Sequence, residues 1–136
     1  MGGCIFCDIV AGDAESFVVA ADPHALAFLD INPMASGHCL VVPTRHVADL
    51  LEGGAEVLAE VAPLVEETAR LLVGRLGADG INIFQSTGAA AGQDVFHFHM
   101  HLLPRWKNDG VLKNLVGTPL GVDDLGRVHE QLLDRR

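Results

Sequence analysis

Short apolar runs dominate the first third of the chain and predict strands. The runs Phe17–Ala20 and Ala25–Leu29 flank Asp22-Pro23, a pair typical of turns, so together they predict an antiparallel hairpin. The loop Asp30-Ile31-Asn32-Pro33 follows. The next run, Cys39–Pro43, is apolar throughout and ends at a proline, which predicts a third strand.

The apolar spacing then changes to steps of three and four. Between Ala55 and Leu76 this spacing predicts one long helix. Pro63 lies inside it and removes one backbone hydrogen bond, so we expect a kink or a break at that residue. Gly77 closes the helix, and Ile81–Phe84 predicts a fourth strand.

Histidine and apolar residues alternate strictly over residues 97–103, His-Phe-His-Met-His-Leu-Leu. On a strand, His97, His99 and His101 would share one face while the apolar residues between them were buried on the other. Three such imidazoles indicate chemistry on a phosphate, on a metal, or on both. A single ion shared by all three is disfavoured, because the first and third positions lie about 13 Å apart along a strand.

These elements predict an α+β fold, with about five mainly antiparallel strands, one long helix on one face of the sheet, and a C-terminal helix over 122–136. A length of 136 residues with 49% hydrophobic residues is that of a single domain, 1–136, which needs no disulfides to stabilise its core. The segment 107–136 has a weaker pattern and is expected to form a C-terminal extension.

A net charge of −9 argues against binding to DNA or RNA. Any phosphate must therefore be bound locally, which suits a small nucleotide better than a polymer. The sequence has no secretory signal and no long apolar stretch, so we expect a cytoplasmic protein that does not bind membranes. Cys39 lies inside an apolar run and is expected to be a buried small residue.

The histidine run matches the HφHφHφφ signature of the histidine triad (HIT) superfamily, and the chain most resembles its bacterial Hint-like members. The resemblance covers about residues 4–106. It also includes flanking motifs on both sides of the signature: Cys4-Ile5-Phe6-Cys7, Asp30-Ile31-Asn32-Pro33, Gly37-His38, Ala91-Gly92-Gln93 and Pro104-Arg105.

The resemblance implies a HIT-like fold, a homodimer, and hydrolysis or transfer at the α-phosphate of a purine nucleotide. His99 would be the nucleophile, forming a nucleotidyl-histidine intermediate that water resolves. His101 would contact the phosphate oxygens or the leaving group, and His38 would complete the catalytic set. The implied nucleotide-binding residues are Asp30, Ile31, Ser86, Gly92, Gln93, Asp94, His99 and His101.

Two positions depart from the Hint pattern. Asp94 stands where a Ser or Thr often follows the glutamine, and an ionised carboxylate cannot donate to a phosphate oxygen. Ser86 aligns with an Asn and has a shorter side chain. The leaving-group preference is therefore open.

The spacing Cys4-x-x-Cys7 is compatible with redox chemistry, with a metal, or with a pair of unligated thiols. His46 and His97 would complete a Cys2His2 set, which is a closed tetrahedral zinc site. Galactose-1-phosphate uridylyltransferases and some bacterial HIT proteins look similar here. We therefore expect structural zinc and no organic cofactor.

Two other functional hypotheses remain open. A nucleotide-sensing or scaffold protein would keep the pocket but turn substrate over very slowly. A metal-dependent enzyme would use the histidine triplet as ligands and lose all activity on chelation, although the strand spacing disfavours it.

Overall fold

The computed structural model describes residues 3–112 and 117–133. In chain order the elements are α1 (Ile5–Ala11), β1 (Val18–Ala21), β2 (Ala25–Leu29), β3 (Cys39–Pro43), α2 (Leu50–Leu76), β4 (Gly80–Phe84), the 3₁₀ turn η1 (Ala89–Ala91), β5 (Met100–Arg105) and α3 (Val122–Leu133). The predicted α+β class is confirmed, as are the hairpin and the third and fourth strands to within one residue. Helix α1 was not predicted, and residues 134–136 of the predicted C-terminal helix lie outside the described residues.

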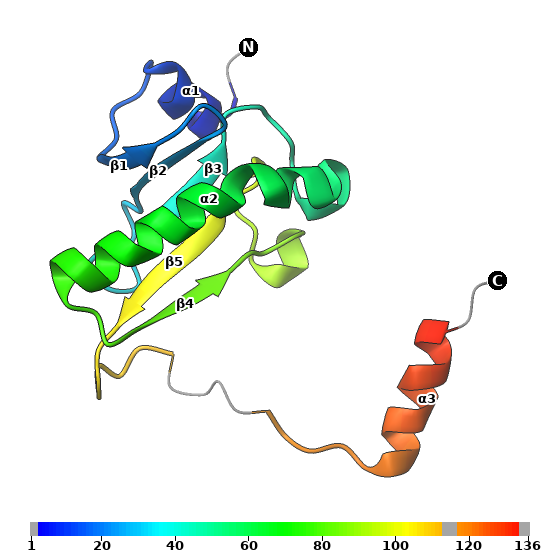
Figure 1. The fold of residues 1–136 in the computed structure, drawn as a ribbon. Helices are drawn as coiled ribbons and strands as arrows, with labels where there is room; N and C mark the ends of the chain where they lie inside the picture. The colour runs from blue at the N-terminus through cyan, green and yellow to red at the C-terminus, as the bar shows by residue number, and fades with distance from the viewer. Residues whose placement is uncertain (1–2, 113–116, 134–136) are drawn as a thin grey trace.

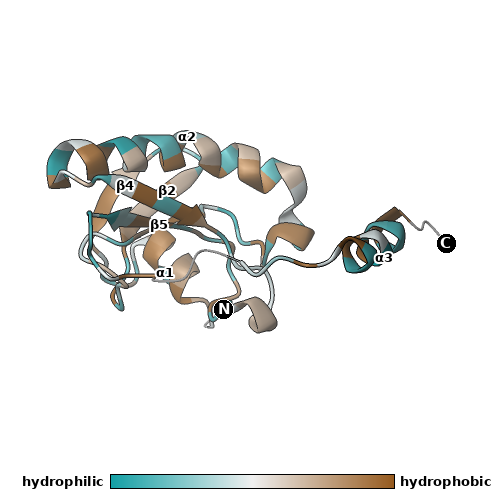
Figure 2. Cartoon of the chain, turned by 90° about the horizontal axis from the view of Figure 1, so that it is seen from below, coloured by the Kyte–Doolittle hydropathy of each residue, from teal (hydrophilic) through white to brown (hydrophobic). Residues whose placement is uncertain are grey.

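The five strands form one antiparallel sheet in the order β1-β2-β3-β5-β4. Helix α2 covers one face and α1 the other, as Figures 1 and 2 show. Side chains of β3 therefore alternate between two apolar clusters: Cys39 and Val41 pack toward α2, and Leu40 and Val42 pack with Phe6 of α1. Every residue of β3 is buried, because both of its faces are covered.

The break in α2 lies at Gly54 and not at Pro63, so the expected position was wrong. Gly54 has φ 66° and ψ −164°, a conformation available essentially to glycine alone, and it separates a first turn capped by Asp49 from the longer helical part. The helix also begins at Leu50, before the expected Ala55. At Pro63 the backbone stays helical, since the packed residues on either side, Val61 and Leu64, hold that part of the helix against the sheet.

Strand β5 begins at Met100, so His97 and His99 precede the ladder instead of lying in it. Pairing with β3 ends at Val41↔Met100, because the next partners along β3 approach Pro43, which has no N–H to donate. The N–H of Phe98 donates instead to the carbonyl of Val47, at 2.7 Å. The predicted alternation nevertheless holds, since Phe98 and Met100 pack toward α2 while the histidine rings face α1.

In the described ranges, no helix is long and apolar enough to cross a bilayer. The described residues of α3 are exposed along its whole length.

Candidate active site and metal centre

A hollow of about 240 Å³ opens between α1, the end of β2 and the histidine segment. One wall is apolar and comes from Phe6 and Ile9 of α1 with Phe28 of β2. Another wall carries His99 and His101. The site therefore combines a surface suited to a flat apolar ring with two imidazoles at its edge.

The proton on His99 is assigned by its backbone partner. Its Nδ1 lies 2.8 Å from the carbonyl oxygen of His97, and a carbonyl can only accept, so Nδ1 carries the hydrogen. The lone pair is therefore on Nε2. The Phe6 and His99 rings pack in a T-shaped arrangement, at 5.1 Å between centroids and 86° between planes, which holds the imidazole in place.

His101 is held by His38 and by an aromatic ring. The Nε2 of His38 lies 3.0 Å from Nδ1 of His101, and Phe84 stacks on the His101 ring at 4.5 Å and 6°. Burial, followed by the neighbouring His99 and His38, lowers the pKa of His101 to about 4. Burial also lowers the pKa of His38, against the opposing effect of Asp30. Both rings are therefore neutral at pH 7.

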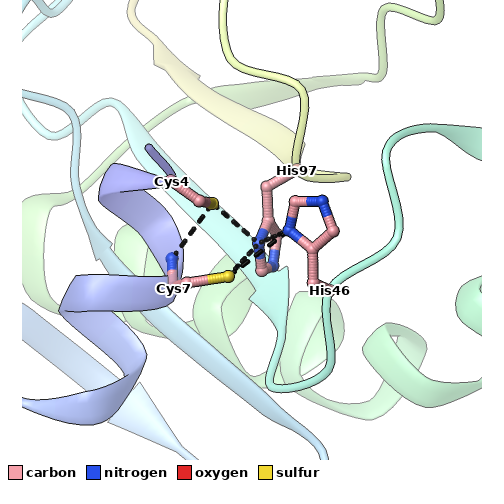
Figure 3. Close-up of side chains that lie close together, drawn as sticks. All are labelled: Cys4, Cys7, His46 and His97. Atoms are coloured by element: carbon pink, nitrogen blue, oxygen red, sulfur yellow. Dashed lines mark hydrogen bonds between the residues drawn. The ribbon is translucent and has the colours of Figure 1, made fainter. Parts of the chain in front are cut away.

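Four sulfur and nitrogen ligands from distant parts of the chain meet beside this hollow. Cys4 and Cys7 come from the start of α1, His46 from the loop after β3, and His97 from the segment before β5 (Figure 3). Four of the six distances between their facing atoms are 3.2–3.5 Å, and all six are within 4.8 Å. Edges of a tetrahedron around zinc measure about 3.3–3.8 Å at normal bond lengths, so the set is the right size for one ion.

Hydrogen bonds around the cluster also suit a metal. The Nε2 of His97 donates to the carbonyl of Pro43 at 2.9 Å, which leaves the Nδ1 lone pair facing the sulfur atoms. The N–H of Cys7 donates to the sulfur of Cys4. Without an ion, burial and the neighbouring Cys4 raise the pKa of Cys7 to about 11, so a bound cation would be needed to make it a thiolate at pH 7.

A second group, Asp30, His38 and His101, brings three ligand atoms within 4.8 Å of one another but does not fit a metal. The N–H of Met34 donates to Nδ1 of His38 at 3.1 Å. If Nε2 of His38 also bound an ion, both ring nitrogens would have to be unprotonated, which a neutral imidazole cannot provide. This group is therefore better described as a hydrogen-bonded network.

The loop after β4 is built around the side chain of Gln93. Its amide oxygen accepts from the N–H of Gly88, and its amide nitrogen donates to the carbonyls of Ala48 and Val95. Gln93 is 4% exposed, so this amide is occupied in holding the loop. Gly92 follows the 3₁₀ turn with φ 96°, a left-handed conformation that favours glycine.

The predicted site residues fall into three places. The hollow is lined by five of them: Asp30, Ile31, Asp94, His99 and His101. His38 lies behind His101 and contacts its ring. The four predicted metal ligands lie together. Ser86, Gly92 and Gln93 belong to the neighbouring loop and do not line the hollow.

Sequence reasoning missed the wall that α1 provides, and it missed the stacking of Phe84 on His101. The sequence does contain a pattern that predicts helix α1. Ile5, Phe6 and Ile9 have helical spacing, and Gly12 ends the segment with φ 81°.

Comparisons with known proteins agree with this geometry. A sequence model described as "HIT domain" matches residues 11–108. "Protein hit" of Bacillus subtilis is 43% identical over 108 residues, which cover 79% of this chain and 74% of that protein. The adenosine 5′-monophosphoramidase HNT1 of Saccharomyces cerevisiae is 34% identical over 131 residues, which cover 96% of this chain and 80% of that protein.

Two solved structures are also similar. SMU.412c from Streptococcus mutans superposes with a TM-score of 0.89 at 39% identity, covering 97% of this chain and 84% of that one. A zinc-bound histidine triad family protein from Mycobacterium smegmatis superposes with a TM-score of 0.77 at 38% identity, covering 91% of this chain and 88% of that one.

Proposed function

The chain belongs to the HIT family, and from this premise we propose that it is a nucleotide hydrolase or transferase acting at the α-phosphate of purine nucleotide derivatives. The proposed substrate classes are nucleoside phosphoramidates and dinucleoside polyphosphates. One relative is named as an adenosine 5′-monophosphoramidase, which supports a nucleotide substrate. The observation that carries the proposal is the Nε2 lone pair of His99, which has no hydrogen-bond partner in the described part of the chain and lies at the edge of the hollow.

In the proposed mechanism the nucleotide base lies against the apolar wall that includes Phe6, Phe28 and Ile31. Oδ1 of Asp30 accepts from the N–H of Asn32. Oδ2 lies 3.7 Å from Nε2 of His38, beyond hydrogen-bond distance, and can therefore accept from a ribose hydroxyl. The α-phosphate would then lie beside His99 and His101.

The chemical step has two balanced halves. The Nε2 lone pair of His99 forms a bond to phosphorus, while the bond from phosphorus to the leaving group breaks and its electron pair departs with that group, which takes a proton from water. Nδ1 keeps its hydrogen and its bond to the His97 carbonyl, which stabilises the charge on the ring. Water then attacks phosphorus, and the P–N bond breaks with its electron pair returning to Nε2 of His99. The attacking water releases one proton, which replaces the proton that the leaving group took from water in the first half.

We also propose that Cys4, Cys7, His46 and His97 hold a structural zinc ion. Four protein ligands leave no open position for water, so zinc would fix α1 against the histidine segment and take no part in the reaction. The zinc-bound relative supports this assignment.

A homodimer is proposed through the β4 edge of the sheet, one of its two edges. β4 is an edge strand, and its Ile83 is 48% exposed. Val73 of α2, which borders a shallow hollow with Ile81 of β4, is 50% exposed. Light scattering should give the mass of two chains for the wild type and of one chain for Ile83→Glu.

The test of the catalytic proposal compares the wild type with His99→Ala. Each protein is incubated with adenosine 5′-phosphoramidate and with a diadenosine polyphosphate, and released AMP and intact protein mass are measured. His24→Ala, at an exposed histidine away from the hollow, is the matched control. AMP release by the wild type and control only, with a trapped adenylyl adduct, is expected. Nucleotide binding without turnover by any of the proteins would favour a sensing role instead.

A further inference from the structure

A chain of hydrogen bonds runs from a backbone amide to the edge of the hollow. The N–H of Met34 donates to Nδ1 of His38 at 3.1 Å. The Nε2 of His38 then lies 3.0 Å from Nδ1 of His101. The chain therefore connects the loop before β3 to an imidazole that borders the hollow.

The hydrogen bond from Met34 determines which ring nitrogen carries the hydrogen in both His38 and His101. A backbone amide can only donate, so Nδ1 of His38 holds a lone pair, and a neutral His38 must carry its hydrogen on Nε2. That hydrogen is donated to Nδ1 of His101. His101 in turn must carry its own hydrogen on Nε2, which has no hydrogen-bond partner among the described residues.

The loop that presents the Met34 amide is held from several sides. The N–H of Asp30 donates to the carbonyl of His38 at 2.9 Å, and the N–H of His38 donates to that of Ala35 at 3.0 Å. A Cβ on Gly37, whose φ is 95°, would lie 2.6 Å from Leu76. Because His38 is only 2% exposed, water does not compete for its nitrogens.

We propose that the Met34 amide and His38 are positioning groups that keep His101 in the tautomer with its Nε2 hydrogen directed at the phosphate. The proposal rests on the proposed function and adds to it an explanation of why Nε2 of His101 is a hydrogen-bond donor. In the opposite tautomer, His101 would present a lone pair to the phosphate oxygens and repel them. Because His101 is neutral, its tautomer and not its charge makes it a hydrogen-bond donor.

The test uses the one substitution that removes a backbone N–H. Met34→Pro deletes the donor, and Met34→Ala keeps it while changing the same half-exposed side chain. Proteins labelled with ¹⁵N at histidine are compared by NMR, since long-range couplings report which ring nitrogen carries hydrogen. Signals are assigned with His38→Leu and His101→Asn.

The wild type and Met34→Ala should show His38 and His101 each protonated on Nε2. In Met34→Pro both rings should become mixtures of tautomers, and kcat should fall about 3- to 10-fold relative to Met34→Ala, the worth of about one hydrogen bond. Unchanged tautomers in Met34→Pro would overturn the proposal.

A second pair keeps the test valid if Met34→Pro does not fold. Gln at position 38 can donate an N–H to His101, whereas Leu cannot. His38→Gln should therefore retain the His101 tautomer and more of the kcat than His38→Leu, for which a loss of roughly 10²-fold is expected. Equal tautomers in both variants would contradict the proposal. The NMR result is independent of turnover, so wild-type tautomers as stated with no AMP release would reject the proposed function alone.

Discussion

The Nδ1 atom of His99 lies 2.8 Å from the carbonyl oxygen of His97, two residues back along the chain. This local contact leaves the lone pair on Nε2 of His99. The same His97 donates through its own Nε2 to Pro43 and turns Nδ1 toward Cys4 and Cys7. One residue thus orients both the proposed nucleophile and the proposed metal site.

Metal removal is expected to destabilise the protein. At free zinc about 100-fold above its dissociation constant, a bound ion contributes about 3 kcal/mol to the free energy of unfolding, and Cys4→Ser or chelation should remove it. Denaturant unfolding measures the loss. Co²⁺ substitution should give a strong thiolate-to-metal absorption band in the wild type and a clearly weaker band in Cys4→Ser, which keeps only the Cys7 thiolate.

Cys39→Ala is the matched control for that experiment. Cys39 is buried under α2 and donates to the carbonyl of Gly37, away from the cluster. It should retain the cobalt band and the metal content. Loss of the band in this variant, or its survival at full intensity in Cys4→Ser, would contradict the ligand assignment.

Acid should destabilise the fold through His101. Its pKa is lowered to about 4 by burial and by the neighbouring histidines, against 6.5 for the ordinary side chain. Between pH 4 and 6.5 the unfolded chain binds more protons at this residue than the folded chain does. The free energy of unfolding therefore has its full value above pH 6.5 and decreases as the pH falls through this window.

The measurement is urea unfolding of the wild type and His101→Asn between pH 4.5 and 7.5. Asn does not titrate, so the variant should lose less stability on acidification, by about 1–3 kcal/mol over the window. Parallel pH profiles would show that His101 does not contribute.

Gln93→Ala should disrupt the loop between β4 and β5. The buried amide satisfies the N–H of Gly88 and the carbonyls of Ala48 and Val95. Removing it should cost about 1–3 kcal/mol of unfolding free energy, because these groups lose their partner in a buried setting. Thermal unfolding would detect this, and an unchanged Tm would refute the assigned role.

Gly54→Ala and Gly74→Ala should change stability in opposite directions, although both lie in α2. Gly54 has φ 66°, where an alanine is strained, and a loss of about 1–3 kcal/mol is expected. Gly74 has open space at its Cβ position and no positive φ, so alanine there should stabilise by about 0.5–1 kcal/mol. Similar unfolding free energies for the two variants would show that an alanine at position 54 is not strained.

The sequence by itself determined the features that depend on local periodicity. The alternation over residues 97–103 already separates Phe98 and Met100 from the histidines, because successive side chains in an extended chain face opposite ways. The strands and the long helix follow from apolar spacing in the same way. The position of the break in α2 did not follow, since the backbone angles of Gly54 depend on how α2 packs after the Asp49 cap.

Only the tertiary structure decided the chemistry of the side chains. The tautomers of His38 and His101 depend on the amide of Met34, and that of His97 on the carbonyl of Pro43, 54 positions away in the sequence. The convergence of the two cysteines with two histidines, and the wall that α1 adds to the hollow, also require the sheet to be assembled. Hydrogen bonds of this kind act over about 3 Å in space, and that proximity is created by folding and not by spacing along the chain.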